Sequence, residues 1–287
     1  MTERIFVVGA GVVGFASGRA LLGSGHRVSF VDTRAERCAE LTDAGFESST
    51  TLELDNDRTI IALSVPTPSV DAAYDLSYLR EAVRTTAEAI KTRGGEHIVV
   101  VRSTVAPQTC DEVVAPLLQS ILEGSSAKAH VASVPEFLRQ ATALEDALHP
   151  TMTVIGSPLP EVRSRLENVF GSLGGEIRVF EDTASSELVK IAHNCFNAAK
   201  ISFFNELYVL AASIGLDGDK IANVVVRSAE ASTNIDYGTK GGFPFGGNCL
   251  PKDLDGLIAF AERQGNAASV LRAVREINNS LAVLQGL

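Results

Sequence analysis

The 287-residue sequence contains no tryptophan, and only 6% of its residues are aromatic. It has 24 glycines, and its shares of apolar residues (45%) and charged residues (21%) are close to those of ordinary globular proteins. This composition excludes pervasive disorder and favours a chain of mixed α/β kind, rich in small residues, over an aromatic-rich β-sandwich. The length is sufficient for one large domain or two ordinary ones, each with a core.

Cysteine is also scarce, and the chain has no CxxC pair. Its four cysteines lie far apart in the sequence, at Cys38, Cys110, Cys195 and Cys249. We therefore expect neither a disulfide framework nor a metal site, but a reducing cytosol. The N-terminal apolar run Ile5–Phe15 is too short to span a bilayer, and it lacks the basic start and cleavage site of a signal peptide. The sequence thus predicts a cytoplasmic protein with no membrane partner.

Positive charge is in deficit, with 25 Lys and Arg against 35 Asp and Glu, for a net charge of −10. A surface of this sign repels phosphate backbones unless a local basic patch compensates. The sequence contains no long Lys/Arg run, so we expect no nucleic-acid partner.

Short β-branched runs alternate with longer helical patterns over about the first 180 residues. Several of the short runs are apolar throughout, as expected for strands that helices cover on both faces. Such alternation predicts a parallel, right-handed, doubly wound sheet. The strand candidates are Arg4–Val8, Arg27–Val31, Thr59–Ser64, His97–Arg102, Ala129–Ser133, Met152–Ile155 and Glu176–Phe180, and the helical patterns include Val13–Gly23, Arg34–Ala44 and Leu76–Thr92.

After Asp182 the strands stop, and three long helical patterns occupy the remainder. The first, Ala184–Ile214, is apolar around most of its circumference, so it must be buried on nearly all sides. Because so little chain remains to cover it, we expect a second copy of the chain to do so, as in a homodimer. The last pattern, Ala267–Leu284, carries a single apolar stripe.

Residues 7–14 read VVGAGVVG, a GxGxxG motif that follows a predicted strand and opens a predicted helix. The first glycine permits a tight turn, the second lets a pyrophosphate approach the backbone, and the third allows close packing of helix on strand. The next strand ends at Asp32, where a carboxylate accepts hydrogen bonds from ribose hydroxyls. This acid favours NAD over NADP, and Arg34 and Arg37 just beyond it soften the preference. We therefore predict a Rossmann-type NAD-binding domain over residues 1–182 and a helical dimerisation and catalytic domain over residues 183–287.

Two polar segments follow the third and fourth predicted strands. They are Val65-Pro66-Thr67-Pro68 and Arg102-Ser103-Thr104-Val105-Ala106-Pro107. Open α/β sheets bind ligands at the carboxyl ends of their strands, so we expect both segments at the cofactor site. The alternative is that Thr67 and Thr104 serve only as turn or cap residues.

The segment GGNCLPKD, residues 246–253, carries a candidate nucleophile. Pro251 suits the first turn of a helix, which places Cys249 just before the helix N-terminus. The positive end of that helix, with Lys252 nearby, favours the thiolate form, and Asp253 is close enough to orient a water or a hydroxyl. The alternative is that Cys249 is a small buried hydrophobe.

Three further polar residues are candidates for the same chemistry. Lys190 and Asn194 are spaced i, i+4 on a predicted helix and share one face, where a cation and an amide stabilise an alkoxide and hold a water. Glu136 follows the fifth predicted strand and offers a carboxylate at the same sheet edge. The alternative is that Lys190 and Glu136 are ordinary solvated side chains.

Taken together and in this order, the motifs resemble the UDP-glucose/GDP-mannose 6-dehydrogenase family over nearly the whole chain. Further segments that carry the likeness are Asp75–Tyr78, Pro135–Arg139, Glu187–Lys190, Lys200–Ser202 and Asn205-Glu206. The stretches Glu136–Gly156 and Gly242–Asp253 look more like the GDP-mannose branch. Asn234 stands where the UDP-glucose branch usually has an arginine.

The resemblance implies two successive oxidations, from primary alcohol through aldehyde to carboxylate, with two NAD⁺. By position, Cys249 would form a thiohemiacetal and then a thioester. Lys190 and Asp253, with a water held by Asn194 and Thr104, would stabilise the oxyanions, and Glu136 would assist hydrolysis of the thioester.

The resemblance also implies which residues contact the cofactor and the substrate. Those for the cofactor are Gly9, Gly11, Val12, Val13, Gly14, Asp32, Arg37, Val65, Pro66, Thr67, Ser103, Thr104 and Lys252. Those for the substrate are Phe137, Leu138, Arg139, Lys190, Asn194, Asn234, Tyr237, Gly246 and Cys249.

The sequence departs from the family pattern in two places. Gln140 replaces the second glutamate of the family, four residues after Glu136. Members normally continue into a C-terminal nucleotide-binding domain, so we expect a short form that acts on a nucleotide sugar, or on a smaller nucleoside or sugar analogue, unless a partner supplies that domain. The alternatives are a two-electron dehydrogenase of the hydroxyacid or phosphogluconate type and a non-catalytic NAD-binding dimer.

Overall fold

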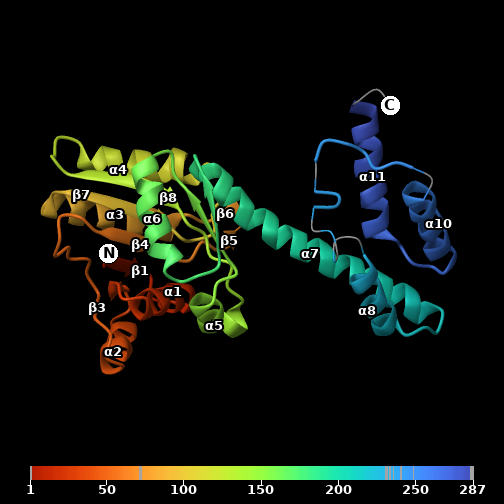
Figure 1. The fold of residues 1–287 in the computed structure, drawn as a ribbon, viewed down its shortest axis with the longest axis horizontal. Helices are drawn as coiled ribbons and strands as arrows, with labels where there is room; N and C mark the ends of the chain where they lie inside the picture. Colours follow the sequence, from red (N-terminus) through yellow and green to blue (C-terminus); the bar gives the residue numbers. More distant parts are fainter. Residues whose placement is uncertain are drawn as a thin grey trace. The chain divides into compact units, whose positions relative to one another are not determined.

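A computed structural model of the chain describes residues 2–70, 73–229, 232, 234, 236–239, 241–247 and 249–284. The chain divides into two compact units, Met1–His193 and Asn194–Leu287. Figure 1 shows the sheet of the first unit and the helices of the second. No helix within the described ranges has the length and apolar character needed to cross a membrane.

The first unit contains an eight-stranded sheet with the strand order β10-β9-β8-β7-β4-β1-β2-β3. Its strands are β1 (Arg4–Val8), β2 (Arg27–Val31), β3 (Ser48–Ser49), β4 (Ile60–Leu63), β7 (Glu96–Val101), β8 (Lys128–Ser133), β9 (Met152–Gly156) and β10 (Glu176–Phe180). A separate hairpin is formed by β5 (Ser69–Val70) and β6 (Ala73–Tyr74).

The direction of the strands corrects one sequence-based prediction. All neighbours in the sheet are parallel as predicted, except β8 and β9, which pair in the antiparallel sense. A parallel return requires a crossover along the face of the sheet. The connection between these two strands instead carries the short helix α5 (Ala143–Leu148), which packs against α1 (Val12–Gly23). The prediction of a wholly parallel sheet is therefore wrong at β9 and β10.

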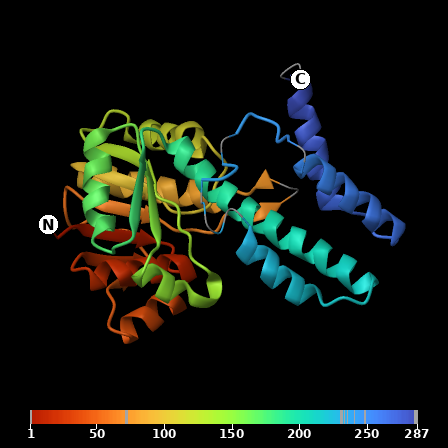
Figure 2. The same cartoon turned by 45° about the vertical axis from the view of Figure 1, so that its right-hand side comes forward.

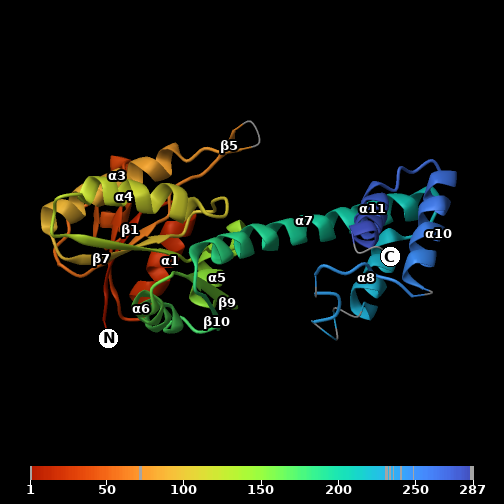
Figure 3. The same cartoon turned by 90° about the horizontal axis from the view of Figure 1, so that it is seen from above.

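Helices cover both faces of the sheet, as predicted for a doubly wound fold (Figure 3). Alternate residues of each strand point to opposite faces: in β1, Ile5 and Val7 join the core under α1 and α6, whereas Phe6 joins the core under α3 and α4. The remaining helices of this unit are α2 (Ala35–Asp43), α3 (Ser77–Arg93), η1 (Cys110–Val114), α4 (Ala115–Leu122), η2 (Gln140–Thr142) and α6 (Pro160–Gly171).

The second unit is helical. The described residues after Asp182 form α7 (Thr183–Ser213), α8 (Gly218–Ser228), α10 (Leu250–Arg263) and α11 (Ser269–Leu284), where the sequence predicted three helices. The helix α8 begins at an N-cap in which the Asp217 carboxylate accepts from the Lys220 amide at 3.0 Å. It runs beside the second half of α7 (Figure 2). Leu210 of α7 forms a small core with Ile258 and Ala261 of α10 and Leu271 of α11.

The start of α1 is set by a close contact of backbone with backbone. Gly9 adopts a φ of +93°, and a Cβ on it would lie 2.6 Å from the Ser64 carbonyl oxygen. A Cβ on Gly14 would collide with the carbonyl oxygen of Gly9 itself. Only glycine at these two positions lets α1 begin directly over the end of β1.

We predict that Gly14→Ala destabilises the fold. Because the atom that meets the new methyl group is a backbone oxygen, the free energy of unfolding should fall by about 1–3 kcal/mol, the usual cost of overpacking. Chemical denaturation measures this change. The matched control is Gly23→Ala at the other end of α1, where a Cβ has no neighbour within 4 Å; it should leave stability unchanged or raise it by about 0.5–1 kcal/mol. Equal stabilities of the two variants would contradict the packing argument.

Candidate active site

The glycine turn and Asp32 form one hydrogen-bonded unit at the carboxyl edge of the sheet. The Gly9 amide donates to the Val31 carbonyl at 2.7 Å, and the Ala10 amide donates to Oδ2 of Asp32 at 2.9 Å. Gly11 is the N-cap of α1, and a Cβ on it has no neighbour within 4 Å. The glycine at position 11 therefore serves no packing purpose in the chain itself, but leaves open the space where a ligand meets the start of α1.

The Asp32 carboxylate is only 7% exposed and accepts four hydrogen bonds. Besides the Ala10 amide, its donors are the backbone amide of Arg34 at 3.0 Å, the Arg34 Nε at 2.9 Å and the Arg34 Nη2 at 3.0 Å. Burial raises the pKa of Asp32, but these hydrogen bonds and the charge of Arg34 outweigh it, so the pKa is lowered below its ordinary value. Asp32 is therefore ionised at neutral pH.

A groove of about 800 Å³ runs along the start of α1 between α2 and α5. Arg37 lines it and is held in place, with Nε donating to the Ala10 carbonyl at 2.9 Å, Nη1 to Glu40 at 2.9 Å, and the guanidinium 5.1 Å from the Phe15 ring. Val12 opens α1 with 55% of its surface exposed toward solvent. The size of the groove and its position at a helix N-terminus fit a dinucleotide.

The two polar segments that the sequence assigned to the cofactor site contact each other. The Ser103 hydroxyl donates to the Val65 carbonyl at 2.7 Å, and the Thr67 hydroxyl donates to the Thr104 carbonyl at 2.6 Å. These bonds join the loop after β4 to the loop after β7 at the carboxyl edge of the sheet. Pro66, between them, is exposed.

Lys190 and Glu136 form an ion pair, with Nζ 3.4 Å from the carboxylate. Both side chains are largely buried, at 7% and 12% exposure. The Glu136 carboxylate also accepts from the Leu138 amide at 2.6 Å, and the Lys190 ammonium lies 5.4 Å from the centre of the Phe137 ring. The Phe137 ring in turn meets the ring of His193 edge-on at 5.2 Å. A buried cation beside a buried carboxylate is the arrangement needed to stabilise an alkoxide and to move a proton.

The other residues predicted near Glu136 have structural contacts of their own. Leu138 packs on Ala16 and Ala20 of α1, together with Ala143 and Ala147 of α5. Arg139 is exposed and pairs with Asp146 on α5 at 2.6 Å. The side chain of Gln140 lies outside the described residues.

Glu187 is a residue whose role the sequence analysis missed. Its carboxylate is 2% exposed and accepts from the amides of Gln108 at 2.7 Å and Cys110 at 2.9 Å, at the start of η1. Gln108 has a φ of +73°, which a non-glycine residue rarely adopts. Burial raises the pKa of Glu187, while its hydrogen bonds lower it, and the net shift is upward. Glu187 lies three residues before Lys190 on α7, so it fixes that turn of α7 beside the loop that carries Thr104.

Arg102 directly follows β7. It is 7% exposed, donates from Nη2 to the Ser17 hydroxyl at 3.2 Å and lies 5.2 Å from the Phe170 ring. Its Nε has no hydrogen-bond partner among the described residues. Burial lowers the pKa of Arg102 to about 10, and the negative charge of Glu136 acts in the opposite direction. Arg102 stays protonated at neutral pH and contributes positive charge to the environment of Glu136.

The remaining predicted residues belong to the second unit. Cys249 is exposed and is the N-cap of α10, with Pro251 in the first turn. The amide of Asp253 donates to the Cys249 carbonyl at 2.9 Å, and the exposed side chains of Asp253 and Lys252 pair at 3.1 Å. Asn194 lies one turn after Lys190 on α7.

The other substrate-binding candidates of this unit precede α10 in the sequence. Asn234, Tyr237 and Gly246 are exposed, and the Tyr237 amide donates to the Asn234 carbonyl at 3.1 Å.

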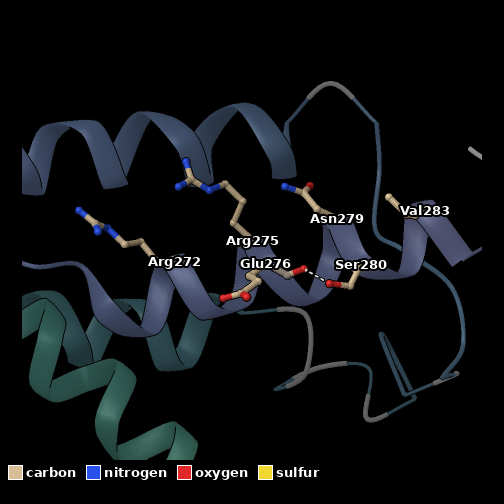
Figure 4. A pocket seen from close by; sticks show the side chains of 6 residues that line it. All are labelled: Arg272, Arg275, Glu276, Asn279, Ser280 and Val283. Carbon is tan, nitrogen blue, oxygen red and sulfur yellow. Dashed lines mark hydrogen bonds between the residues drawn. The ribbon is translucent and has the colours of Figure 1, made fainter.

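A second groove, of about 490 Å³, follows one face of α11. Figure 4 shows Arg272, Arg275 and Asn279 projecting to the same side of this helix. Both arginines are neutralised by carboxylates of α10, since Arg272 pairs with Glu262 at 2.6 Å and Arg275 with Asp255 at 3.3 Å. We therefore do not assign this groove as an anion site.

The lowered pKa of Asp32 gives a pH-dependent prediction. A carboxyl group whose folded pKa is below its unfolded value contributes stability above the unfolded pKa and loses it as the pH falls through the folded pKa. The stability difference between wild type and Asp32→Asn should therefore be largest near neutral pH and shrink below about pH 3.8. Urea denaturation of both proteins from pH 7 downward measures it. A difference that grows in acid would contradict the assigned hydrogen bonds.

Comparison with known proteins identifies the family to which the chain belongs. The NAD binding domain of the UDP-glucose/GDP-mannose dehydrogenase family matches residues 44–173, and the central domain of that family matches residues 184–280. GDP-mannose 6-dehydrogenase of Pseudomonas aeruginosa is 32% identical over 279 residues, with 88% of this chain and 63% of that protein covered. UDP-glucose 6-dehydrogenase of Haloferax volcanii is 30% identical over 307 residues, with coverage of 96% and 69%.

Solved structures agree with these relatives. A crystal structure of a ternary complex of GDP-mannose dehydrogenase from Pseudomonas aeruginosa superimposes with a TM-score of 0.86 at 29% identity, covering 99% of this chain and 71% of that one. A UDP-glucose dehydrogenase from Pyrobaculum islandicum gives a TM-score of 0.73 at 32% identity, with coverage of 98% and 68%.

This chain thus spans 63% of the length of the Pseudomonas aeruginosa relative. The resemblance found in the sequence is confirmed, and so is NAD as the cofactor, since the first unit contains the NAD binding domain of the family. The chain belongs to the UDP-glucose/GDP-mannose dehydrogenase family.

Proposed function

We propose that the chain catalyses the NAD-dependent, four-electron oxidation of a primary alcohol to a carboxylate. The substrate is a nucleotide sugar of the GDP-mannose or UDP-glucose type, or a smaller nucleoside or sugar analogue, and the reacting carbon of a nucleotide sugar is C6. The single observation that carries this proposal is the buried pair of Lys190 and Glu136, 3.4 Å apart, in a chain that also holds a cysteine at a helix N-terminus. The GDP-mannose and UDP-glucose 6-dehydrogenases among its relatives support the substrate class.

The first unit holds the cofactor in this proposal. The glycine turn and the N-terminus of α1 receive the pyrophosphate, Asp32 receives the ribose hydroxyls, and the joined loops of Val65–Thr67 and Ser103–Thr104 border the nicotinamide. When bound, NAD⁺ accepts a hydride from the substrate carbon.

Lys190 and Glu136 provide the charge and the proton transfer. As the alcohol loses its proton and a hydride, the Lys190 ammonium stabilises the oxygen on which negative charge develops. Glu136, whose carboxylate accepts a hydrogen bond from the Leu138 amide, takes up a proton from water when the thioester is hydrolysed. Asn194 and Thr104 position that water, and Asp253 assists the oxyanion.

In this scheme Cys249 holds the aldehyde intermediate as a covalent adduct. Its thiol adds to the aldehyde carbon to give a thiohemiacetal, loss of the second hydride to a second NAD⁺ gives a thioester, and water releases the carboxylate and the free thiol. Overall, one alcohol, two NAD⁺ and one water give one carboxylate, two NADH and three protons.

Because the thioester forms on Cys249 in this scheme, we predict that Cys249→Ser stops carboxylate formation. Since serine does not form a comparable thioester, the rate should fall by on the order of 10³-fold or more, while NAD⁺ binding is retained. Turnover of GDP-mannose and UDP-glucose, with NADH counted per product identified by mass, measures it. The control is Cys195→Ser, an exposed cysteine on α7 outside the proposed machinery, which should leave turnover unchanged.

Two outcomes would overturn this mechanism. Unchanged acid formation by Cys249→Ser would exclude the covalent route. One NADH per substrate in the wild type, instead of two, would indicate the two-electron dehydrogenase that the sequence left as an alternative.

We also propose that α7 forms the interface of a homodimer in the cytoplasm, where the four cysteines stay reduced. Side chains on α7 that are apolar and more than half exposed are Leu188, Phe196, Ile201, Tyr208 and Val209. A groove of about 520 Å³ passes Ile201 and Phe204 on the same helix. Exposed apolar surface on this scale is typical of a protein interface.

If α7 forms this interface, the wild-type protein should have twice the mass of one chain in solution. Phe196→Glu should shift the protein toward the monomer at micromolar concentration, because Phe196 is the most exposed of the apolar residues on α7. Light scattering coupled to gel filtration measures the mass. Tyr78→Glu on α3, a residue 56% exposed in the first unit, is the control that should stay dimeric. A monomeric wild type would exclude the interface.

A further inference from the structure

Arg34 occupies the hydrogen-bond acceptors that a bound ribose uses. Its Nε donates to Oδ1 of Asp32 at 2.9 Å and its Nη2 to Oδ2 at 3.0 Å, so the guanidinium spans both carboxylate oxygens. The Asp32 side chain beneath it is 7% exposed, whereas that of Arg34 is 63% exposed and lines the 800 Å³ groove. The ribose hydroxyls of a dinucleotide therefore meet an arginine before they meet the carboxylate.

The other arginine of the groove has a different role. Arg37 is 26% exposed and already donates to the Ala10 carbonyl and to Glu40, while it stacks on Phe15. These contacts hold its guanidinium against the chain. Among the described residues, the Arg34 side chain hydrogen-bonds to Asp32 alone, so it is the arginine that a ligand at Asp32 can displace.

The displaced guanidinium remains next to the 2′ position of the ribose, because it belongs to a residue only two positions after Asp32. An acid alone at this place repels a 2′-phosphate by like charge. An arginine at the same place offsets that repulsion and offers two parallel N–H donors, the geometry that suits a phosphate group. Binding of NAD, by contrast, requires the ribose hydroxyls to compete with Arg34 for Asp32.

We propose that Arg34 sets the coenzyme selectivity of this chain, and that through Arg34 the site accepts NADP as well as NAD. The proposal rests on the assignment of the cofactor groove made above. Its distinctive feature is that removal of Arg34 acts on the two coenzymes in opposite directions: the 2′-phosphate loses its partner, and the ribose hydroxyls lose their competitor.

The test is calorimetric titration of NAD⁺ and NADP⁺ into the full chain, without substrate. Wild type should bind both. Arg34→Ala should weaken NADP⁺ at least tenfold and leave NAD⁺ affinity equal or higher. Arg34→Lys keeps the charge but loses the paired donors, so its NADP⁺ affinity should lie between the two.

Two controls separate selectivity from net charge and from folding. Arg84→Ala on α3 removes one positive charge from an exposed pair with Glu81, far along the chain from the groove residues, and should change neither affinity. Arg34→Ala removes two side-chain hydrogen bonds from the buried Asp32 carboxylate, so its melting temperature should fall slightly. The variant should nevertheless stay fully folded at the temperature of the titration, which its melting curve checks.

Three other binding results would overturn the proposal, and each points to a different error. If NAD⁺ binds but NADP⁺ does not, or if Arg34→Ala leaves the ratio of the two affinities unchanged, Arg34 does not set selectivity, and the NAD assignment stands. If neither coenzyme binds the wild type, the cofactor groove itself is wrongly assigned. A fall in both affinities for Arg34→Ala would make Arg34 a general phosphate contact instead.

Discussion

The close contact between Gly14 and the carbonyl oxygen of Gly9 is the constraint on which the cofactor half of the structure depends. It lets α1 begin directly over the end of β1, so the N-terminus of the helix opens at the carboxyl edge of the sheet. The glycine turn also directs the Ala10 amide toward the Asp32 carboxylate, which accepts its hydrogen bond and also accepts one from the Arg34 guanidinium. The groove along α1 follows from this arrangement, because its floor is the glycine turn and its rim is the basic start of α2.

The helix α7 is the second organising element, and it works through two carboxylates. Glu187 accepts hydrogen bonds from the start of η1 in the first unit, and Glu206 accepts from the amides of Val270 and Leu271 at the start of α11 in the second. Each carboxylate satisfies backbone donors that a helix N-terminus leaves unpaired. In the first unit the same helix carries Lys190, so the lysine is held by a helix that is itself tied to the loop of Thr104.

Sequence reasoning was most successful where local pattern determines structure. The predicted strands Arg4–Val8, Arg27–Val31 and Glu176–Phe180 have the bounds that the structure gives, because runs with strand-forming residues end at clear turn signals. The direction of β9 was beyond that reasoning, since it depends on where α5 packs. The function of Glu187 was also hidden, because its partners lie 77 and 79 residues away in the chain. The sequence located Arg34 beside Asp32, but only the structure gives the paired hydrogen bonds on which coenzyme selectivity rests.

The glycine turn of the first unit should hold NAD, and the decisive measurement is titration of NAD⁺ into the wild type and into Gly11→Ala. A Cβ at this position has no neighbouring atom within 4 Å, so the variant should have the same melting temperature as the wild type. It does, however, fill the space where the pyrophosphate approaches the backbone. We predict saturable binding of one NAD⁺ per chain in the wild type, and loss of this binding in Gly11→Ala at unchanged stability. Equal binding by both proteins would contradict it.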